Sequence, residues 1–415
     1  MDTTNHLRHI VSKPRFAVVI ALLMLAPRPG LSQTEKVLYS FVGGTDGANP
    51  YYGNLVRDSK GNLYGTTLNG GAANYGTVFE VSPTGKEKLL HSFVGYPGDG
   101  SNPNSSLLRD SEGNLYGTTT GGGSGLPVNC GVYGLNGCGT VFEVTKSGTE
   151  IVLYNFELLS TFDGAIPYAG LVRDSKGNLY GTTNYGGMAN EGTVFELAPT
   201  GAETVLYNFC SATGCADGAF PESTLFRDWR GNLYGTTADG GSGACTNGCG
   251  TVFKVTPTDT ETVLHSFTGQ PNDGANPRSG LVFDAKGNAY GTTNSGGAYN
   301  VGTVFRLTPR GKEIIYSFGS SASDGSGPVA AVALDRQGSI YGTTPTGGTD
   351  GYGTVFKIGT RGRETVLYSF TGGADGATPL GGLVLDGQGN LYGTTQYGGS
   401  SDCSGGCGVV FQLTP

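Results

Sequence analysis

Short runs rich in β-branched and aromatic residues alternate with Gly-rich turns along almost the whole chain. The first set comprises four such runs, residues 54–58, 62–67, 76–82 and 87–93. The connections within the first pair and within the last pair are short, and each contains a Gly that suits the left-handed position of a hairpin turn. The pattern therefore predicts four antiparallel strands per unit, named A to D in chain order.

This unit occurs seven times. Strand B carries the heptapeptide Gly-Asn-Leu-Tyr-Gly-Thr-Thr or a close variant, with its tyrosines at Tyr64, Tyr116, Tyr180, Tyr234, Tyr290, Tyr341 and Tyr392. Strand C carries Gly-Thr-Val-Phe, or once Gly-Val-Val-Phe, and strand D ends in a Phe. Four strands in each repeat of 51 to 64 residues predict an all-β fold, a seven-bladed β-propeller of four-stranded antiparallel blades. An open solenoid is the alternative.

The repeat is out of phase with the ends of the chain. A run of D type, residues 36–41, comes first, and a run of C type, residues 408–414, comes last. We expect the first strand to complete the last blade, so that the ring closes three-plus-one and leaves no free sheet edge. A solenoid would leave both incomplete ends unexplained.

Residues 1–32 predict a secretory signal peptide, and residues 33–415 predict a single propeller domain. Arg8, Lys13 and Arg15 precede an apolar run, residues 16–26, that is too short to span a bilayer comfortably. An uncleaved anchor is the alternative for this segment. No second apolar stretch follows, so we expect a secreted protein, extracellular or periplasmic, with no membrane span in the mature chain.

The charge of the chain argues against one class of partner. The chain has 25 basic and 33 acidic residues, a formal charge of −8, and the predicted signal peptide holds four of the basic residues but only one acidic residue. Because such an acidic surface repels phosphate backbones, we do not expect nucleic-acid binding. We expect the mature chain to be a monomer.

The cysteines fall into close pairs. On an exported chain, an even number in such pairs predicts disulfides that close loops. The four predicted disulfides are Cys130–Cys138, Cys210–Cys215, Cys245–Cys249 and Cys403–Cys407. Zinc binding is the alternative, but the mature chain keeps only His91 and His265, and neither lies near a cysteine pair. Both histidines replace a Tyr that the other five units carry.

Strand direction divides the connections between two faces of the predicted disc. The A–B and C–D turns share one face, the short-turn face, and the B–C and D–A connections share the other, the long-loop face. All eight cysteines belong to the long-loop face, where the B–C loop has eight residues in blades 1, 3, 5 and 6, 19 in blade 2, and 12 in blades 4 and 7. Constrained loops are typical of binding surfaces, although stabilising a long insertion requires the same constraint.

The loops of this face also supply candidate binding residues. Aromatic faces beside amides suit sugar rings, which stack through C–H groups and hydrogen-bond through hydroxyls. The candidates are Asn74, Tyr75, Tyr185, Asn190, Tyr299, Asn300, Tyr352 and Tyr397. Ordinary loop formation is the alternative explanation of these residues.

The motif Asp-Gly-X-X-Pro recurs in the D–A loops. Its aspartates are Asp46, Asp99, Asp163, Asp217, Asp273, Asp324 and Asp375. We expect each Asp to cap its own loop, because Asp side chains accept hydrogen bonds from nearby backbone N–H groups. Calcium ligation is the alternative. We expect no other metal and no cofactor.

Strand A differs between the two parts of the chain. Blades 1 to 4 carry Arg57, Arg109, Arg173 and Arg227, where blades 5 to 7 carry Phe283, Leu334 and Leu385. These arginines could hold an anionic ligand in the central channel, but we expect them to pair with nearby Asp residues. Trp229, the one Trp, interrupts an A–B turn and receives no role.

The combination of Gly-Asn-Leu-Tyr-Gly-Thr-Thr, Gly-Thr-Val-Phe, Leu-Tyr-Ser-Phe and Asp-Gly-Ala-X-Pro resembles the GloVer tandem repeat of choice-of-anchor proteins. The resemblance covers nearly all of residues 35–415. It implies an exported bacterial repeat protein, often linked to the cell surface, without an established activity. The chain ends at Pro415 inside the last unit, so surface attachment is not expected from the sequence.

Two classes of function remain. The first is a secreted binding or scaffold module that uses the long-loop face, with a polysaccharide or an extracellular protein as its partner. The second is an enzyme acting on extracellular polysaccharide, a glycoside hydrolase or lyase, with Asp239, Asp350 and Asp402 as candidate carboxylates. No Ser/His/Asp set is expected, since both remaining histidines replace a strand Tyr. A purely structural role is the third alternative.

Overall fold

The computed structural model describes Met1 and residues 34–124, 130, 136–157 and 163–414. The chain divides into two compact units, Met1–Ser32 and Gln33–Pro415, and the fold below is that of the second unit. The predicted signal peptide lies outside the described residues except for Met1.

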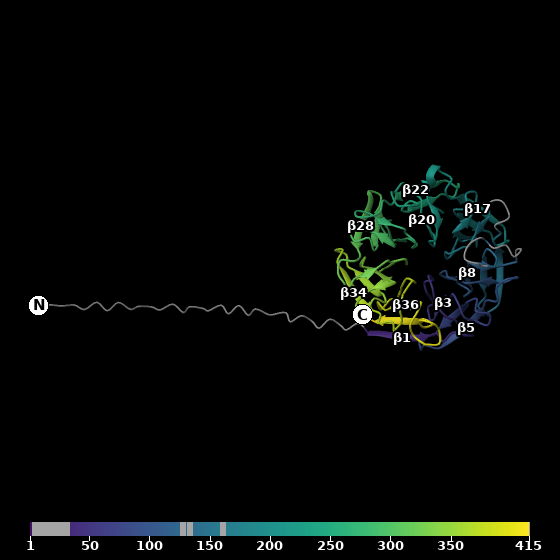
Figure 1. Cartoon of the computed structure of the whole chain (residues 1–415), viewed down its shortest axis with the longest axis horizontal. Coiled ribbons are helices and arrows are strands. Elements are labelled where there is room, and N and C mark those ends of the chain that lie inside the picture. Colours follow the sequence, from purple (N-terminus) through teal and green to yellow (C-terminus); the bar gives the residue numbers. More distant parts are fainter. Residues whose placement is uncertain (2–33, 125–129, 131–135, 158–162, 415) are drawn as a thin grey trace. The chain divides into compact units, whose positions relative to one another are not determined.

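Among the described residues, the second unit contains seven antiparallel sheets of four or five strands, and these are arranged in a ring (Figure 1). Each sheet contains one strand of each type, paired in the order A-B-C-D. The unit is therefore a seven-bladed β-propeller, as the repeat predicts.

The four types of strand have nearly constant lengths. The A strands, which begin each blade, are β2 Val56–Arg57, β7 Leu108–Arg109, β13 Val172–Arg173, β19 Phe226–Arg227, β24 Val282–Phe283, β30 Ala333–Leu334 and β35 Val384–Leu385. The B strands are β3 Leu63–Thr67, β8 Leu115–Thr119, β14 Leu179–Thr183, β20 Leu233–Asp239, β25 Ala289–Thr293, β31 Ile340–Thr344 and β36 Leu391–Thr395. The C strands are β4 Thr77–Val81, β10 Thr140–Val144, β16 Thr193–Leu197, β21 Thr251–Val255, β27 Thr303–Thr308, β33 Thr354–Ile358 and β37 Val409–Thr414. The D strands are β5 Glu87–Ser92, β11 Glu150–Asn155, β17 Glu203–Asn208, β22 Glu261–Ser266, β28 Gly311–Ser317, β34 Glu364–Ser369 and β1 Thr34–Ser40.

The ring closes three-plus-one. Strand β1 pairs antiparallel with β37, in a register that sets Thr34 opposite Thr414 and Ser40 opposite Val409. Figure 1 shows β1 beside the C-terminal strand. The first strand therefore completes the last blade, and the closure expected from the sequence is confirmed.

One aromatic contact repeats at every junction between blades. The Phe that follows strand D meets the strand C Phe of the next blade edge to face, with ring centroids 4.9 to 5.2 Å apart. Phe41 and Phe79 form the contact that joins blade 7 to blade 1. These rings are buried, so the recurring phenylalanines form the core between blades.

The Gly-Thr-Thr motif of strand B follows from packing. A Cβ atom at Gly65 would lie 2.7 Å from the Phe79 ring, so Gly makes room for the strand C Phe. The next residue, Thr66, donates a hydrogen bond to the Ser105 carbonyl of the following blade (3.2 Å). The last, Thr67, shares a hydrogen bond with the Thr77 hydroxyl in strand C (2.7 Å). Each residue of the motif thus has a structural role.

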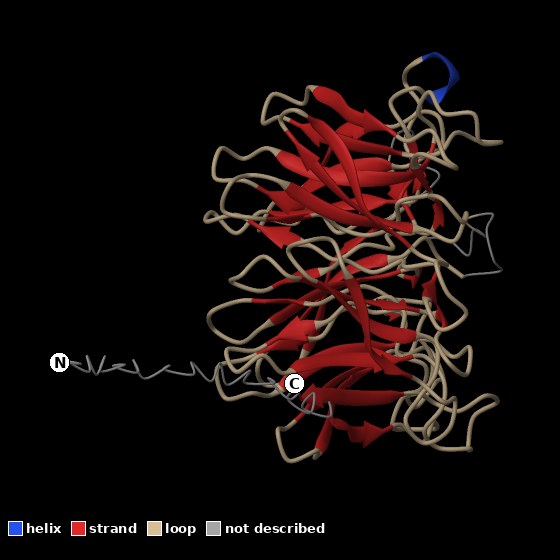
Figure 2. Ribbon diagram, turned by 90° about the vertical axis from the view of Figure 1, so that its left-hand side faces the viewer, coloured by secondary structure: helices blue, strands red, loops and turns tan. Residues whose placement is uncertain are grey.

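Loops gather on the two faces of the disc, as the edge-on view shows (Figure 2). On the long-loop face, the D–A and B–C connections of most blades form small ribbons, β6 Gly100–Ser101 with β9 Gly121–Gly122, β12 Gly164–Ala165 with β15 Tyr185–Gly186, β23 Gly274–Ala275 with β26 Ser295–Gly296, and β29 Gly325–Ser326 with β32 Thr346–Gly347. In blade 4, β18 Ala219–Pro221 pairs with the extended β20 instead. One 3₁₀ turn, η1 Thr213–Cys215, lies in the preceding loop.

Candidate functional site

The residue after the Pro of Asp-Gly-X-X-Pro lies where each D–A loop turns toward its innermost strand. The motif recurs in each blade, but the side chains at this position differ. They are Tyr51, Asn104, Tyr168, Glu222, Arg278, Val329 and Leu380. Six of these seven residues line two connected cavities near the axis of the ring.

The outer cavity, of about 580 Å³, opens between the loops of the long-loop face. Its lining residues are mostly aromatic or polar and include Tyr51, Tyr52, Asn102, Asn104, Thr120, Tyr168, Asn184, Tyr185, Phe220, Glu222, Asp239 and Arg278. The inner cavity, of about 250 Å³, lies beside the residues that lead into the A strands. Because Tyr52, Tyr168, Glu222 and Arg278 line both, we treat the two as one site and call it the axial cavity.

An ion pair lies in the wall that the two cavities share. The Arg278 guanidinium donates to a Glu222 carboxylate oxygen at 3.1 Å, and both side chains are partly buried. Burial raises the pKa of Glu222, with Asp239 adding to the shift and Arg278 opposing it. Burial also raises the pKa of Asp239, against hydrogen bonds from Asn247 and Asn276 and the charge of Arg278. The site therefore holds two carboxyl groups that bind protons more readily than usual, beside one cation.

Aromatic rings surround the ion pair. Tyr51 and Tyr52 contact each other with centroids 4.3 Å apart, and Tyr185 meets Phe220 at 5.2 Å. Burial raises the pKa of Tyr52, which keeps its hydroxyl protonated. The wall thus presents apolar ring surfaces beside charged and neutral hydrogen-bonding groups.

Two amide side chains in this wall have unused hydrogen-bonding atoms. Asn104 is 2% exposed and Asn184 is 4% exposed. Asn104 Oδ1 and Asn184 Nδ2 are buried and have no hydrogen-bond partner among the described residues. A buried polar atom without a partner costs free energy, so a ligand or a water that pairs with these atoms is favoured.

Of the eight predicted binding residues, the structure brings only Tyr185 into this cavity. The three predicted asparagines have a structural role in their own loops. Asn74, Asn190 and Asn300 adopt positive φ of 58 to 62°, and each side-chain oxygen accepts a bond from a backbone N–H four residues earlier, at 2.9 to 3.2 Å. This local capping explains their recurrence.

The exposed predicted tyrosines lie over glycines of neighbouring loops. Tyr75 covers Gly95 and Tyr352 covers Gly372, each close enough that a Cβ on the glycine would meet the ring within 3 Å. In blade 7, the Cys403–Cys407 disulfide occupies the corresponding place over Gly43. Tyr299 lies beside Gly319 in the same manner, while Tyr397 forms a backbone bridge with Ala377. Carbohydrate contact by these four tyrosines stays a prediction.

All four predicted disulfides are present in the structure, Cys130–Cys138, Cys210–Cys215, Cys245–Cys249 and Cys403–Cys407. No free cysteine occurs in the chain. Each bond closes a loop of the long-loop face, as expected.

The recurring aspartates cap their loops. Asp46, for example, accepts bonds from the Val42 N–H at 2.8 Å and from the Tyr39 hydroxyl at 2.7 Å. The same pair of contacts, to a loop N–H and to a strand D Tyr, recurs at Asp163, Asp217, Asp324 and Asp375. The capping prediction is confirmed.

The strand A arginines reach toward the preceding blade. Arg173 pairs with Asp110 at 3.4 Å, and its guanidinium lies 5.2 Å from the centroid of the Tyr116 ring. Arg57 pairs with Asp386 at 4.0 Å, so the predicted pairing with Asp is confirmed for these two arginines. Trp229 is 85% exposed on the short-turn face.

Sequence reasoning missed most of the axial cavity. The signal was present, because the residue after the recurring Pro differs in most blades, while that Pro and the Asp and Gly of the motif repeat. Asp239, a predicted carboxylate, does line the cavity, whereas Asp350 and Asp402 are exposed outside it.

Seven repeated blades around a variable axial cavity define the protein as a β-propeller built from tandem repeats. The chain belongs to the Gloeobacter/Verrucomicrobia repeat family, whose model matches residues 27–247 and 226–415. This membership confirms the resemblance to the GloVer repeat.

Solved structures show the same fold. The chain is 13% identical to a streptogramin B lyase, with a TM-score of 0.58 over 92% of this chain and 97% of the lyase. It is 15% identical to the extracellular domain assigned to a hybrid two-component system of B. thetaiotaomicron, with a TM-score of 0.55 over 92% of this chain and 41% of that one. The chain thus spans less than half of the second protein. No curated protein matches in sequence.

The setting of the protein follows from its family and its cysteines. Four disulfides and membership of a repeat family typical of exported proteins indicate an extracellular module. Within the described residues, no helix is long and apolar enough to cross a membrane.

Proposed function

We propose that the protein is a secreted binding module that holds an oligosaccharide segment of an extracellular polysaccharide in its axial cavity. The observation that carries the proposal is the wall of that cavity, where tyrosine rings surround an ion pair and two buried amides without partners. Sugar rings match this combination, because they have apolar C–H faces and a rim of hydroxyl donors and acceptors.

The size and position of the cavity support the same proposal. A volume of about 580 Å³ lies within the usual range of ligand sites. The Glu222–Arg278 pair offers both an acceptor and donors to hydroxyl groups, and Asn104 and Asn184 offer one acceptor and one donor. An extracellular location exposes the site to polysaccharides.

A specific observation favours an enzyme as the second candidate. Glu222 and Asp239 line one cavity, and burial raises the pKa of both. A carboxyl group with a raised pKa can serve as a general acid in glycoside cleavage. This candidate would act on the same class of ligand in the same place.

Binding is tested with a glycan array followed by titration calorimetry, using neutral and acidic oligosaccharides of four to six sugars. For the oligosaccharide with the strongest signal, we expect Tyr168→Ala and Asn184→Ala each to weaken binding about 10- to 100-fold. Trp229→Ala is the control, since it removes an exposed aromatic side chain of the opposite, short-turn face, and it should bind as the parent does. Silence on the array, or equal losses in all three variants, would contradict the proposal.

The second candidate is separated from the first by turnover. If the protein is an enzyme, the bound oligosaccharide is cleaved, and Glu222→Gln or Asp239→Asn abolishes cleavage. Binding without cleavage by the parent protein supports the binding module alone.

A further inference from the structure

Each junction between blades contains a group of three side chains from two neighbouring D strands and the loop between the blades. The group combines a residue near the end of one D strand, the Asp of the following D–A loop, and a residue at the start of the next D strand. In five junctions the set is Tyr, Asp and Glu, namely Tyr39/Asp46/Glu87, Tyr154/Asp163/Glu203, Tyr207/Asp217/Glu261, Tyr316/Asp324/Glu364 and Tyr368/Asp375/Glu35. Two junctions depart from it, and both have His in place of Tyr.

The junction between blades 4 and 5 contains its own cation. His265 Nε2 lies 2.9 Å from one oxygen of Asp273, and Lys312 Nζ lies 2.5 Å from the other. Lys312 stands where the other junctions have Glu. The ammonium and imidazole together lower the pKa of Asp273, despite its burial. In this junction, the Lys312 ammonium therefore supplies a positive charge next to Asp273.

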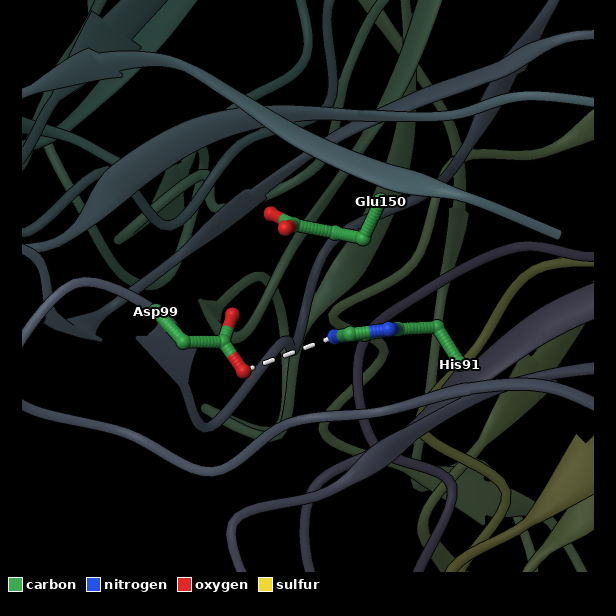
Figure 3. A group of neighbouring side chains, drawn as sticks. All are labelled: His91, Asp99 and Glu150. Carbon is green, nitrogen blue, oxygen red and sulfur yellow. Dashed lines mark ion pairs between the residues drawn. The ribbon is translucent and has the colours of Figure 1, made fainter.

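The junction between blades 1 and 2 has His without the Lys. Its members are His91 in β5, Asp99 in the D–A loop and Glu150 in β11, and their side chains converge (Figure 3). One ligand atom from each residue lies within 4.8 Å of the other two. This is the one such His/Asp/Glu group found among the described residues.

Two of the three residues that converge here have a ligand atom without a hydrogen bond. His91 Nε2 and a Glu150 oxygen are buried without a hydrogen bond, and His91 Nε2 is 3.5 Å from the nearest Asp99 oxygen. Asp99 is 7% exposed and is held in place by the N–H groups of Val94 at 2.7 Å and Gly100 at 2.6 Å. Unlike its counterpart, this junction is short of positive charge.

We propose that His91, Asp99 and Glu150 bind a divalent transition-metal ion of the Zn²⁺ type. One imidazole nitrogen and two carboxylate oxygens form an accepted ligand set for Zn²⁺, with water completing the tetrahedron. Ligand atoms around a tetrahedral Zn²⁺ lie about 3.3 Å apart, close to the 3.5 Å between His91 and Asp99. The ion supplies the positive charge that Lys312 supplies in the counterpart junction.

The chemistry of the set selects the class of metal. Calcium and magnesium prefer oxygen ligands, so a His nitrogen disfavours them. The backbone N–H groups that fix Asp99 act as outer contacts that orient a ligand before the metal arrives. The ion would join blade 1 to blade 2 through residues of both, and would stabilise that junction.

The test is the binding of Zn²⁺ alone to the purified protein, by titration calorimetry and by metal analysis after dialysis. Two variants are expected to fold, because each reproduces a side-chain set that another junction of this chain contains. His91→Tyr gives the set of the five Tyr junctions, and Glu150→Lys gives the set of the junction that contains Lys312. We expect one bound Zn²⁺ in the parent protein and an affinity at least ~100-fold lower in both variants. His265→Tyr is the matched control and should leave this binding unchanged.

A gain of binding sharpens the test. Lys312→Glu places a second carboxylate beside His265 and Asp273 in the junction between blades 4 and 5. This variant should therefore bind two Zn²⁺ ions. Zn²⁺ should also raise its thermal midpoint by more than it raises that of the parent protein. With Co²⁺ as the probe, the intense visible bands of a tetrahedral site should appear in the parent and be absent in His91→Tyr. No saturable binding by the parent, or binding that survives both His91→Tyr and Glu150→Lys, would overturn the proposal.

Discussion

We call the repeated residues of the blades, namely the buried phenylalanines, the Gly-Thr-Thr motifs and the side-chain groups at the junctions, the shell of the propeller. The shell and the wall of the axial cavity use the same repeat in opposite ways. In the shell, one residue occupies each position in nearly all blades, and its contacts are satisfied, as with Phe253 against Phe209. In the wall, the position after the recurring Pro holds Tyr51, Glu222, Arg278 or another side chain on the same backbone. A repeated residue therefore reports what a blade needs to fold, whereas a varied residue on a repeated backbone marks where a ligand can bind.

The largest expected effect comes from breaking the shell. Phe253→Ala removes a fully buried ring from a junction and should lower the free energy of unfolding by about 3–5 kcal/mol, since it leaves a cavity in tight packing. Chemical denaturation followed by fluorescence measures the loss. Tyr299→Ala, at a position that is 55% exposed, is the control and should change stability little. Similar losses in both variants would show that the shell is not the source of stability.

The shell should also respond to pH. Burial and a facing Asp raise the pKa of Glu35, Glu87, Glu203, Glu261 and Glu364 to about 7, with Asp375, Asp46, Asp163, Asp217 and Asp324 as the respective partners. Because these pKa values exceed those of the unfolded chain, the groups stabilise the fold fully below pH 4.5 and lose this contribution as the pH rises through about 7.

At acidic pH, the stability of the fold should depend on pH in the opposite direction. Hydrogen bonds from Asn62 and Lys60 lower the pKa of Asp58, although partial burial opposes the shift, and the same holds for its counterparts in other blades. Their contribution is lost as the pH falls below 3.8. The thermal midpoint should therefore be higher at pH 5.5 than at pH 8.5 by several degrees. Glu203→Gln should reduce this difference, and a midpoint that rises toward pH 8.5 would contradict the assignment.

A disulfide of the long-loop face should have a smaller effect. Replacing Cys245 and Cys249 together with Ser opens a loop with a sequence separation of four and should lower stability by about 2 kcal/mol. The measurement is differential scanning calorimetry of the variant and the parent. A loss as large as that of Phe253→Ala would mean that this bond supports the blades as well as its loop.

The smallest effect is expected where the shell itself varies. Arg109 lies over the Tyr64 ring, 5.5 Å from its centroid, while Leu334 and Leu385 replace the arginine in later blades and belong to the apolar clusters that also involve Tyr290 and Tyr341. Arg109→Leu should therefore change the free energy of unfolding by less than about 1 kcal/mol. Calorimetry again provides the measurement, and a large loss would give this arginine a role that its position does not show.

The fold could be predicted from the sequence because its determinants are local and repeated. Gly65, Thr66 and Thr67 each serve one contact that recurs around the ring, so seven copies reveal the rule. Even the closure could be read from the order of strand types at the two ends. Predicted strand limits differ from the observed ones by at most two residues, as for the run 54–58 and β2.

The site could not be predicted in the same way. Its residues come from several blades and meet only because the ring brings the D–A loops to one axis, as with Tyr51, Tyr168 and Arg278. Attention to exposed tyrosines led instead to Tyr75 and Tyr352, which cover glycines of neighbouring loops. Burial, rather than exposure, distinguishes Asn104 and Asn184.

Ligand recognition in the axial cavity can be tested by hydrogen–deuterium exchange. Mass spectrometry would compare the protein with and without the oligosaccharide selected on the array. We expect added protection in peptides that contain residues 51–54, 102–106, 168–170, 184–185, 220–224 and 278–281, and none around Trp229 on the short-turn face. Protection confined to the short-turn face, or to the outer loops of Tyr75, Tyr299 and Tyr352, would contradict recognition in the cavity.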